Sequence, residues 1–199
     1  MRTTIRSVAL VAALSMSVPG CALLGGKAKP LDTYELSAPG PDKSRAKRGI
    51  QILVAEPSAL KALDSQNIVI KPQPGSIEYL SGAQWADRLP RVVQARLAET
   101  FQKSGQFGGV GRPGEGLAID YQIVTEVRAF EIRLDGQKRA HVTLFVRILN
   151  DRNGVVRAAH TFEAEAFVSG AGNDAYVDAL NEAFGKVAKD MVGWTASVI

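Results

Sequence analysis

The most reactive side chain type occurs once in this 199-residue sequence, as Cys21 in the stretch SVPGCALLGG. A lone cysteine can be a nucleophile, a metal ligand, a buried apolar side chain or a point of covalent attachment. A reactive thiolate needs a cationic neighbour or a helix N-terminus to lower its pKa, and residues 17–26 contain no charged residue. A single thiol also rules out an internal disulfide. The surroundings of Cys21 therefore favour attachment.

The segment before this cysteine has the pattern of a secretory signal peptide. Arg2 and Arg6 give it a positive start, and a run of small and apolar residues extends from Val8 to Val18. This order of charged and apolar regions, with small residues before the cleavage site, is typical of export signals. The run is too short to span a bilayer, which takes roughly 20 apolar residues. We expect residues 1–20 to be removed.

The last residues of the leader resemble the bacterial lipobox, with Val18, Pro19 and Gly20 before Cys21. This resemblance implies that Cys21 becomes the acylated N-terminus of the mature protein. The alternative is an ordinary signal peptide followed by an incidental cysteine. Ala22 stands where aspartate would favour retention in the inner membrane of a Gram-negative cell. We therefore expect a lipid-anchored protein of the outer membrane that faces the periplasm.

The remaining polar residues give little support for catalysis, a metal site or a cofactor. His141 is expected to face solvent, and His160 shares the inner parity of its strand and is expected in the core. A hydrolase built on Ser169 or His160 is a remote alternative because no G-x-S-x-G motif is present. With no second cysteine and no pair of histidines at i and i+4, a zinc site is unsupported. Five carboxylates alternate with apolar residues on predicted strands and are expected in solvent: Asp120, Glu126, Glu131, Glu163 and Glu165.

The glycine-rich stretch from Gly105 to Gly116 contains a literal G-x-G-x-x-G at Gly109, Gly111 and Gly114. A dinucleotide site requires a strand before this motif and a helix that opens within it. Here a helical pattern precedes the motif and a strand pattern follows it. A short strand and a turn explain the stretch better.

The charge of the chain argues against nucleic acid as a partner. The formal charge is +4, and it falls to +2 without Arg2 and Arg6 of the leader. A protein that binds phosphate backbones usually carries a stronger basic excess.

The hydrophobic pattern predicts an α+β domain with a mostly antiparallel sheet and two long amphipathic helices packed on it. Residues 21–31 are expected to form a flexible tether, and residues 32–199 a single domain. Period-2 patterns predict strands over 32–38, 49–56, 117–132 and 140–148, a returning strand after Asn153-Gly154, and a hairpin within 67–80. The apolar residues of 117–132 change parity near Ala129, which predicts a bulge.

Two stretches have the 3.6-residue period of helices that bury one face. The first places Trp85, Leu89, Val92, Val93, Leu97 and Phe101 on one side, with Asp87 as the expected N-cap and Gly105 as the stop signal. The second has its N-cap at Asn173 or Asp174 and places Tyr176, Leu180, Phe184, Val187 and Met191 on one side.

The stretch from Ser76 to Gly105, with its core W-A-D-R-L-P at residues 85–90, resembles the ABC-type transport auxiliary lipoproteins, the PqiC-like family. The openings TYELSAP and ILVAEP and the lipobox fit the same pattern. The resemblance runs from about Asp32 to the C-terminus. Within the motif we expect Trp85 and Leu89 to anchor the core and Arg88 to pair with a carboxylate, with contact to a partner as an alternative role for Trp85.

Membership of this family implies a subunit that is not an enzyme and needs no cofactor. The implied partner is an MCE-domain protein that works with an inner-membrane permease and ATPase, and this chain would dock the conduit at the outer membrane. Self-association into a homo-oligomer is a further expectation. The alternative function is a stand-alone lipoprotein that binds a lipid or small apolar ligand between sheet and helices.

Overall fold

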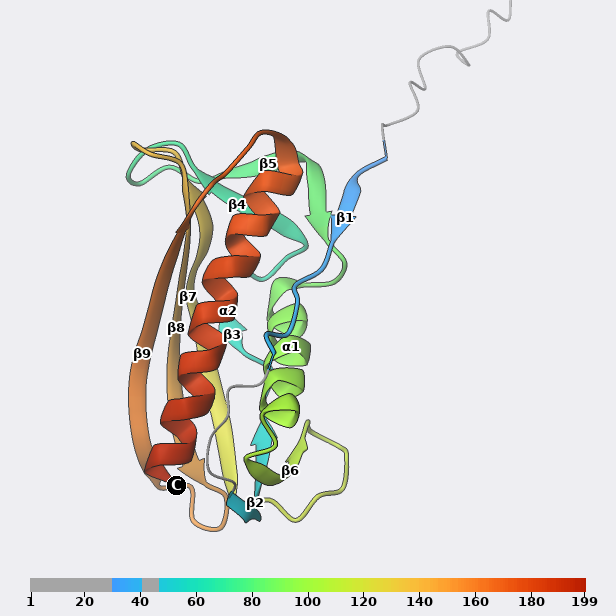
Figure 1. Cartoon of the computed structure of the whole chain (residues 1–199), viewed down its shortest axis with the longest axis vertical. Coiled ribbons are helices and arrows are strands. Elements are labelled where there is room, and N and C mark those ends of the chain that lie inside the picture. Colours follow the sequence, from blue (N-terminus) through green and yellow to red (C-terminus); the bar gives the residue numbers. More distant parts are fainter. Residues whose placement is uncertain (1–29, 41–46) are drawn as a thin grey trace, which may run out of the picture. The chain divides into compact units, whose positions relative to one another are not determined.

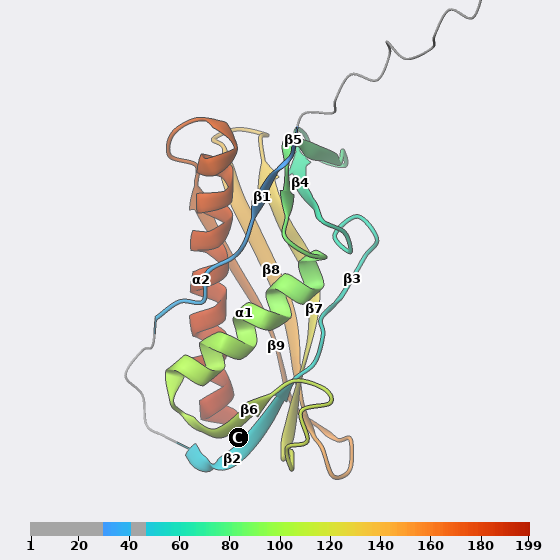
Figure 2. The ribbon, with the colours of Figure 1, turned by 90° about the vertical axis from the view of Figure 1, so that its right-hand side faces the viewer.

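The structure is a computed structural model that describes residues 30–40 and 47–199. Within these residues the chain forms nine strands and two helices, and both helices lie on one face of a single mixed sheet (Figures 1 and 2). The signal peptide and Cys21 lie outside the described residues. Residues Leu31–Ile199 make up one compact unit. The expected α+β class is confirmed.

Strand β7 (Tyr121–Arg133) is the centre of the sheet. One of its edges pairs along its whole length with β8 (Arg139–Asn150), which pairs in turn with β9 (Val156–Phe167). Both of these long ladders are antiparallel, as the sequence predicts. The turn at Asn153-Gly154 joins β8 and β9, and Gly154 has the positive φ of 69° that such a turn requires.

The other edge of β7 accepts three shorter strands one after another, all of them parallel to it. These strands are β2 (Lys47–Val54), β3 (Ser58–Ala59) and β4 (Asn67–Lys71). Strand β4 forms the predicted antiparallel hairpin with β5 (Glu78–Trp85). The sheet ends in two parallel pairs, in which β1 (Asp32–Tyr34) lies beside β5 and β6 (Phe107–Gly111) lies beside β2.

The predicted bulge is present in β7. The pairing with β8 shifts register between Val127 and Ala129. Before the shift, Val127 faces the helices, and after it Phe130 and Ile132 do so. Because a bulge adds one residue to one strand, the apolar residues keep the same side of the sheet despite their change of parity.

Both predicted helices are present, but the first begins after Trp85 and the N-terminal caps of both differ from the prediction. Helix α1 (Leu89–Ser104) has Arg88 as its N-cap and makes no side-chain cap hydrogen bond, so the expectation for Asp87 is wrong. The Asp87 carboxylate instead accepts a hydrogen bond from the backbone N–H of Arg88. Gly105 ends the helix in the left-handed conformation, with a φ of 62°, as predicted.

Helix α2 (Gly172–Val198) begins after Ala171, which is its N-cap, so the caps expected at Asn173 or Asp174 are also wrong. Both side chains are used in contacts to other elements. The Asn173 amide donates to the carbonyl of Ser81, and the Asp174 carboxylate accepts a hydrogen bond from the hydroxyl of Tyr34. A tertiary contact takes the place of a local cap at this end.

The core lies between the helices and the sheet. Its largest fully buried side chains are aromatic, with Trp85 edge-on to Phe130 at 5.8 Å and Phe130 next to Phe184 at 6.1 Å between ring centres. Leu144, Val146 and Ile148 of β8 and Leu180, Val187 and Met191 of α2 complete this layer. Close packing of this kind supplies most of the stability of a domain of this size.

The glycine-rich stretch forms strand β6 and a turn, as predicted. Gly111 ends the strand, and a Cβ atom there would come within 2.5 Å of the Leu117 side chain. Gly114 and Gly116 have positive φ in the turn that follows. The glycines therefore serve close packing and chain reversal, and helix α1 precedes the motif.

Candidate interaction surface

Both described helices lie against one face of β7, β8 and β9, and neither lies against the opposite face (Figures 1 and 2). We call it the open face; on it lie Glu131, His141, Thr143 and Glu163. The sequence predicts that such a face carries solvated side chains. His141 nevertheless has only 5% of its surface exposed and Glu131 only 2%, so both predictions of solvent exposure are wrong.

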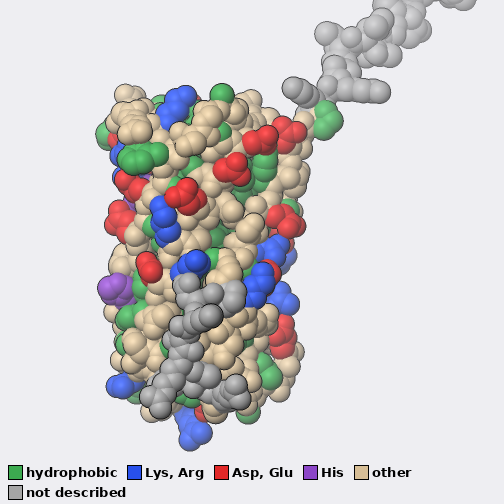
Figure 3. All heavy atoms as spheres, in the orientation of Figure 1, with side chains coloured by type: hydrophobic (Ala, Val, Ile, Leu, Met, Phe, Trp, Pro, Cys, Tyr) green, Lys and Arg blue, Asp and Glu red, His purple; other side chains and the backbone are tan. Residues whose placement is uncertain are grey.

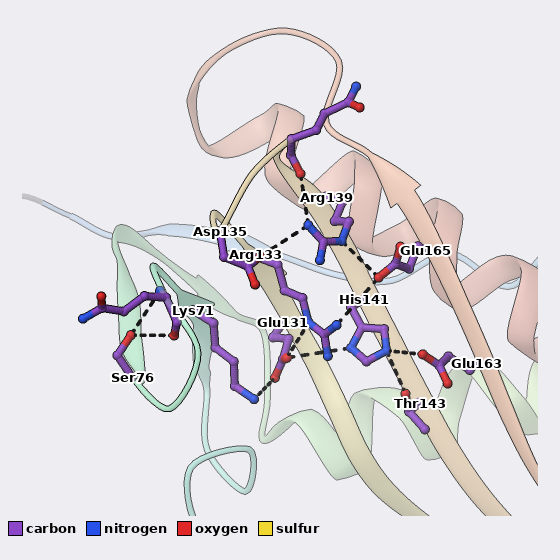
Figure 4. A network of polar contacts seen from close by, with 12 residues as sticks. Lys71, Ser76, Glu131, Arg133, Asp135, Arg139, His141, Thr143, Glu163 and Glu165 are labelled. Carbon is purple, nitrogen blue, oxygen red and sulfur yellow. Dashed lines mark hydrogen bonds and ion pairs between the residues drawn. The ribbon is translucent and has the colours of Figure 1, made fainter.

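His141 is buried because charged side chains from both neighbouring strands surround it (Figure 4). Its Nε2 lies 2.7 Å from Glu163 Oε1 and 3.1 Å from the hydroxyl oxygen of Thr143. Its Nδ1 lies 3.7 Å from Glu131 Oε1, which is an ion-pair distance but too long for a hydrogen bond. The imidazole is thus held between two carboxylates.

Glu131 is the centre of the network. Its two oxygens accept hydrogen bonds from Lys71 Nζ at 3.0 Å and Arg133 Nε at 3.1 Å. Further out, Arg133 and Arg139 both reach Glu165, at 3.8 and 3.1 Å. A buried carboxylate is tolerated only with such partners, because an unpaired charge would cost several kcal/mol.

The network moves the pKa values of its two buried members in opposite directions. Burial alone would raise the pKa of Glu131, but His141, Lys71 and Arg133 overcome it and lower that pKa to about 2. The interaction with Glu131 raises the pKa of His141, burial opposes it, and Glu163 raises it further. Both groups therefore favour their charged forms in the folded protein.

His160 lies on the helix side of β9, as its parity predicts, but it is exposed rather than in the core. Its ring packs against Phe162 at 4.7 Å and Trp194 at 5.8 Å between ring centres. Strand β9 pairs only with β8 and lies at an edge of the sheet, so the parity of His160 predicts its face but not its exposure. Ser169 is also exposed, and the described chain gives no hydrogen bond between it and a histidine.

The W-A-D-R-L-P motif forms the corner between β5 and α1. Trp85 ends the strand, does not belong to the helix, and has 1% of its surface exposed. Leu89 is buried beside it, which confirms both residues as core anchors. Arg88 confirms the expected pairing with acidic residues, since its guanidinium contacts both Asp64 and Glu56. The partner contact considered for Trp85 finds no support in a side chain this deeply buried.

The short segment 32–37, which we call the strap, runs over α2 and contacts both helices (Figure 2). Tyr34 donates a hydrogen bond of 2.6 Å to Asp174 of α2, and this contact raises the pKa of Tyr34 to about 12. The backbone N–H of Ser37 donates to Asn181 of the same helix at 2.7 Å. On the other side, Glu35 pairs with Arg96 of α1 at 2.9 Å. The strap therefore connects the start of the domain to both helices.

A pocket of about 370 Å³ lies on the solvent side of α1, next to the strap. Three arginines line it, and each already has a carboxylate partner: Arg91 with Asp87, Arg96 with Glu35 and Glu99, and Arg112 with Glu115. Figure 3 shows basic and acidic side chains intermixed over this helix. The arginines are neutralised within the chain, so the pocket has no excess charge to attract an anion.

No cluster of three histidine, cysteine or acidic side chains in the described part of the chain is arranged to hold a metal ion. Neither described helix combines the length and the apolar character needed to cross a bilayer. The described residues thus offer contact surfaces and a packed core.

The described residues form a single α+β domain, with a mixed sheet, two helices on one face of it and the strap. The chain belongs to the family of ABC-type transport auxiliary lipoprotein components, whose family model matches residues 34–192. The match covers strands β2 to β9, the end of β1, helix α1 and most of α2, including the W-A-D-R-L-P motif. The family is named for a transport role and not for a catalysed reaction.

Relatives agree with this assignment. The chain is 31% identical over 179 residues to the uncharacterized protein bll6063 of Bradyrhizobium diazoefficiens, covering 88% of this chain and 47% of that protein. It therefore spans about half the length of this curated relative. The crystal structure of protein XCC0632 from Xanthomonas campestris, of family DUF330, superposes with a TM-score of 0.78 at 27% identity, covering 85% of this chain and 96% of that one. A second crystal structure, of an uncharacterized protein, has a TM-score of 0.67 at 15% identity over 84% of this chain and 99% of its own, which shows the fold alone.

Proposed function

We propose that this protein is a lipid-anchored accessory subunit of an envelope lipid transport system of the MCE type. It would be attached through Cys21 to the outer membrane, face the periplasm and dock the conduit that an MCE-domain protein forms. Energy would come from the permease and ATPase of the inner membrane. Assembly of several copies around the conduit is part of the proposal.

The observation that carries the proposal is the family match over residues 34–192, which includes nearly all of the described domain. The described residues add a structural argument. A docking subunit needs a rigid body, a fixed attachment and a surface free for partners. The packed core supplies the first, the strap fixes the chain end that leads to Cys21, and the open face remains without a helix.

The alternative function, a ligand held between sheet and helices, gains no support from the packing. The space that such a ligand would occupy contains Trp85, Phe130, Phe184, Leu180 and Met191, each with at most 1% of its surface exposed. The pocket of about 370 Å³ lies on the other side of α1. Lipid binding in the core would require these side chains to move apart against their packing energy.

The proposal is tested by recovering the full-length protein, with an affinity tag at Ile199, from its native membranes after chemical crosslinking. We expect mass spectrometry of the crosslinked material to identify an MCE-domain protein. The matched control is Cys21→Ser, which keeps the folded domain but removes the attachment, and it should recover far less of that partner. Recovery of the acylated protein without any MCE-domain protein would contradict the proposal.

A further inference from the structure

We infer that one end of the sheet, here called the tether-end rim, rests on the lipid surface to which the protein is anchored. The rim consists of the exposed apolar residues Ile77, Tyr79 and Phe167, with the cations Lys71, Arg133 and Arg139 between them. The inference rests on the proposed lipid anchor at Cys21. It adds a second, direct contact between the folded domain and the membrane.

The strand register places the central residues of the rim in one row. Lys71 of β4 is opposite Arg133 of β7, Arg133 is opposite Arg139 of β8, and Arg139 is opposite Phe167 of β9. The four side chains therefore lie side by side across four strands. Two of the carboxylates that pair with these cations, Glu131 and Glu165, lie two residues away from this end on their strands. The third, Asp135, lies in the β7–β8 turn at this end and pairs with Arg139 at 3.3 Å.

Ile77 and Tyr79 extend the rim at the start of β5. Tyr79 is opposite Val69 of β4, close to the row that ends in Lys71. Ile77, Tyr79 and Phe167 have 50%, 47% and 58% of their surfaces exposed. Apolar and aromatic side chains next to the long stems of lysine and arginine are the combination that membrane interfaces favour, because the rings enter the headgroup region while the charged ends stay hydrated.

The chain leaves the domain toward Cys21 at this same end. Strand β1 runs parallel to β5 with Asp32 opposite Ala83, so the residues before Asp32 extend in the direction of Tyr79 and Ile77. Figures 1 and 2 show the start of β1 at the end of the sheet that also carries the β4–β5 and β7–β8 turns. The strap holds this exit in place through its contacts with both helices.

The length of chain outside the domain keeps this end close to the bilayer. Pro30 follows Cys21 by nine positions, a stretch that reaches at most about 32 Å when fully extended. The opposite end of the sheet also exposes apolar residues, Val155 and Val156 in and after the β8–β9 turn. The short chain to Cys21 therefore favours lipid as the occupant of the rim. Val155 and Val156 lie a full 12-residue strand away from the rim, which makes Val155 a matched control.

The test uses the full-length, acylated protein on vesicles of phosphatidylethanolamine with a minor share of phosphatidylglycerol. Each protein variant carries one spin label, either in the rim or at the control position Val155. Because Cys21 is the only natural cysteine and acylation consumes its thiol, Ile77→Cys, Phe167→Cys and Val155→Cys each introduce a single reactive thiol. All three positions are at least half exposed, so the substitutions leave the core intact.

We expect the accessibility to oxygen, relative to a water-soluble nickel chelate, to rise about threefold at positions 77 and 167 on going from detergent to vesicles, and to stay unchanged at position 155. Equal values at all three positions in an acylated protein would overturn the inference and leave the lipid anchor intact. A change at 77 and 167 only in native membranes, and not on pure lipid, would identify the rim as a protein-binding surface and would also overturn it. A protein that lacks acylation and does not bind vesicles would overturn the proposed anchor itself.

Discussion

Phe130 and Glu131 are neighbours in β7 and have 1% and 2% of their surfaces exposed, yet they are buried by different physical means. Phe130 faces the helices and packs against Trp85 and Phe184. Glu131 faces the other way and is covered by the charged side chains of Lys71, Arg133 and His141. Strand β7 therefore contributes to two layers. The apolar layer on the helix side is held by hydrophobic packing, which does not depend on pH, whereas the ionic layer on the other side depends on the charges of its side chains.

The largest expected effect comes from breaking the apolar side of this comparison with Phe130→Ala. The substitution removes a ring that contacts two other aromatic side chains and leaves a cavity where the helices meet the sheet. We expect a loss of about 4 kcal/mol in the free energy of unfolding, measured with urea. Phe167→Ala, at an exposed site, serves as the control and should change the stability by less than about 0.5 kcal/mol. Similar losses for both would show that the helix-facing layer is not the main source of stability.

The second effect comes from the ionic side, through Glu131→Gln. The amide keeps the shape of the side chain but leaves Lys71, Arg133 and His141 without their shared anion. We expect a loss of about 2 kcal/mol, because Lys71 and Arg133 remain partly solvated and recover some of the lost interaction from water, while the buried His141 keeps Glu163 as its partner. Glu163→Gln is the matched control on the same histidine, and its more exposed carboxylate should cost clearly less. A Glu131→Gln protein as stable as the wild type would contradict the ionic account of burial.

The third prediction concerns the pH dependence of stability, which should come from the ionic layer. The pKa of His141 is raised in the folded state, so its contribution is complete below its ordinary value of 6.5 and is lost as the pH rises through the raised value. The pKa of Glu131 is lowered to about 2 from 4.5, so its contribution is present above 4.5 and is lost as the pH falls toward 2. The network should stabilise the fold most between these limits.

Urea unfolding across this pH range, for the wild type and for His141→Gln, measures that dependence. The difference in stability between the two proteins should be largest near pH 5 to 6 and should shrink toward alkaline pH. A difference that grows with rising pH would mean that His141 is held neutral in the folded protein, and the assignment of its charge would be wrong.

The smallest effect is expected from the second histidine, through His160→Ala. This side chain is exposed and packs against the rings of Phe162 and Trp194. We expect a change of about 0.5 kcal/mol or less in the free energy of unfolding, measured with urea. A loss of about 2 kcal/mol or more would contradict this account, because it would make an exposed ring as important to stability as the buried ionic network.

The two histidines also show which features of the fold and the site could be predicted from the sequence. Parity assigned His141 and His160 to the correct faces, and the parity change near Ala129 correctly predicted a bulge, because both depend only on the two-residue repeat of a strand. Parity carries no information on what covers each face. The burial of His141 depends on Lys71 of β4 and Glu163 of β9, and the exposure of His160 depends on its place on the edge strand β9.

Non-local contacts explain the other differences. The parallel pairings of β2, β3 and β4 along one edge of β7 join segments far apart in the chain, and no short-range pattern encodes them. The cap predicted at Asn173 or Asp174 was wrong because the helix begins earlier, after Ala171. The carboxylate of Asp174 instead accepts a hydrogen bond from Tyr34, 140 residues earlier. The tether-end rim is likewise invisible in the sequence, since the register of four strands brings Lys71 and Phe167 into one row. The motif W-A-D-R-L-P was recognisable because its residues are contiguous.

The central claim, that this auxiliary subunit acts from a lipid anchor, is tested most directly by mass spectrometry of the mature N-terminus from native membranes. The account predicts that the chain begins at Cys21 and carries a thioether-linked diacylglycerol together with an amide-linked acyl chain. A chain that begins elsewhere, or that begins with an unmodified Cys21, would contradict the anchor, and the proposed contact of the tether-end rim with lipid would lose its basis.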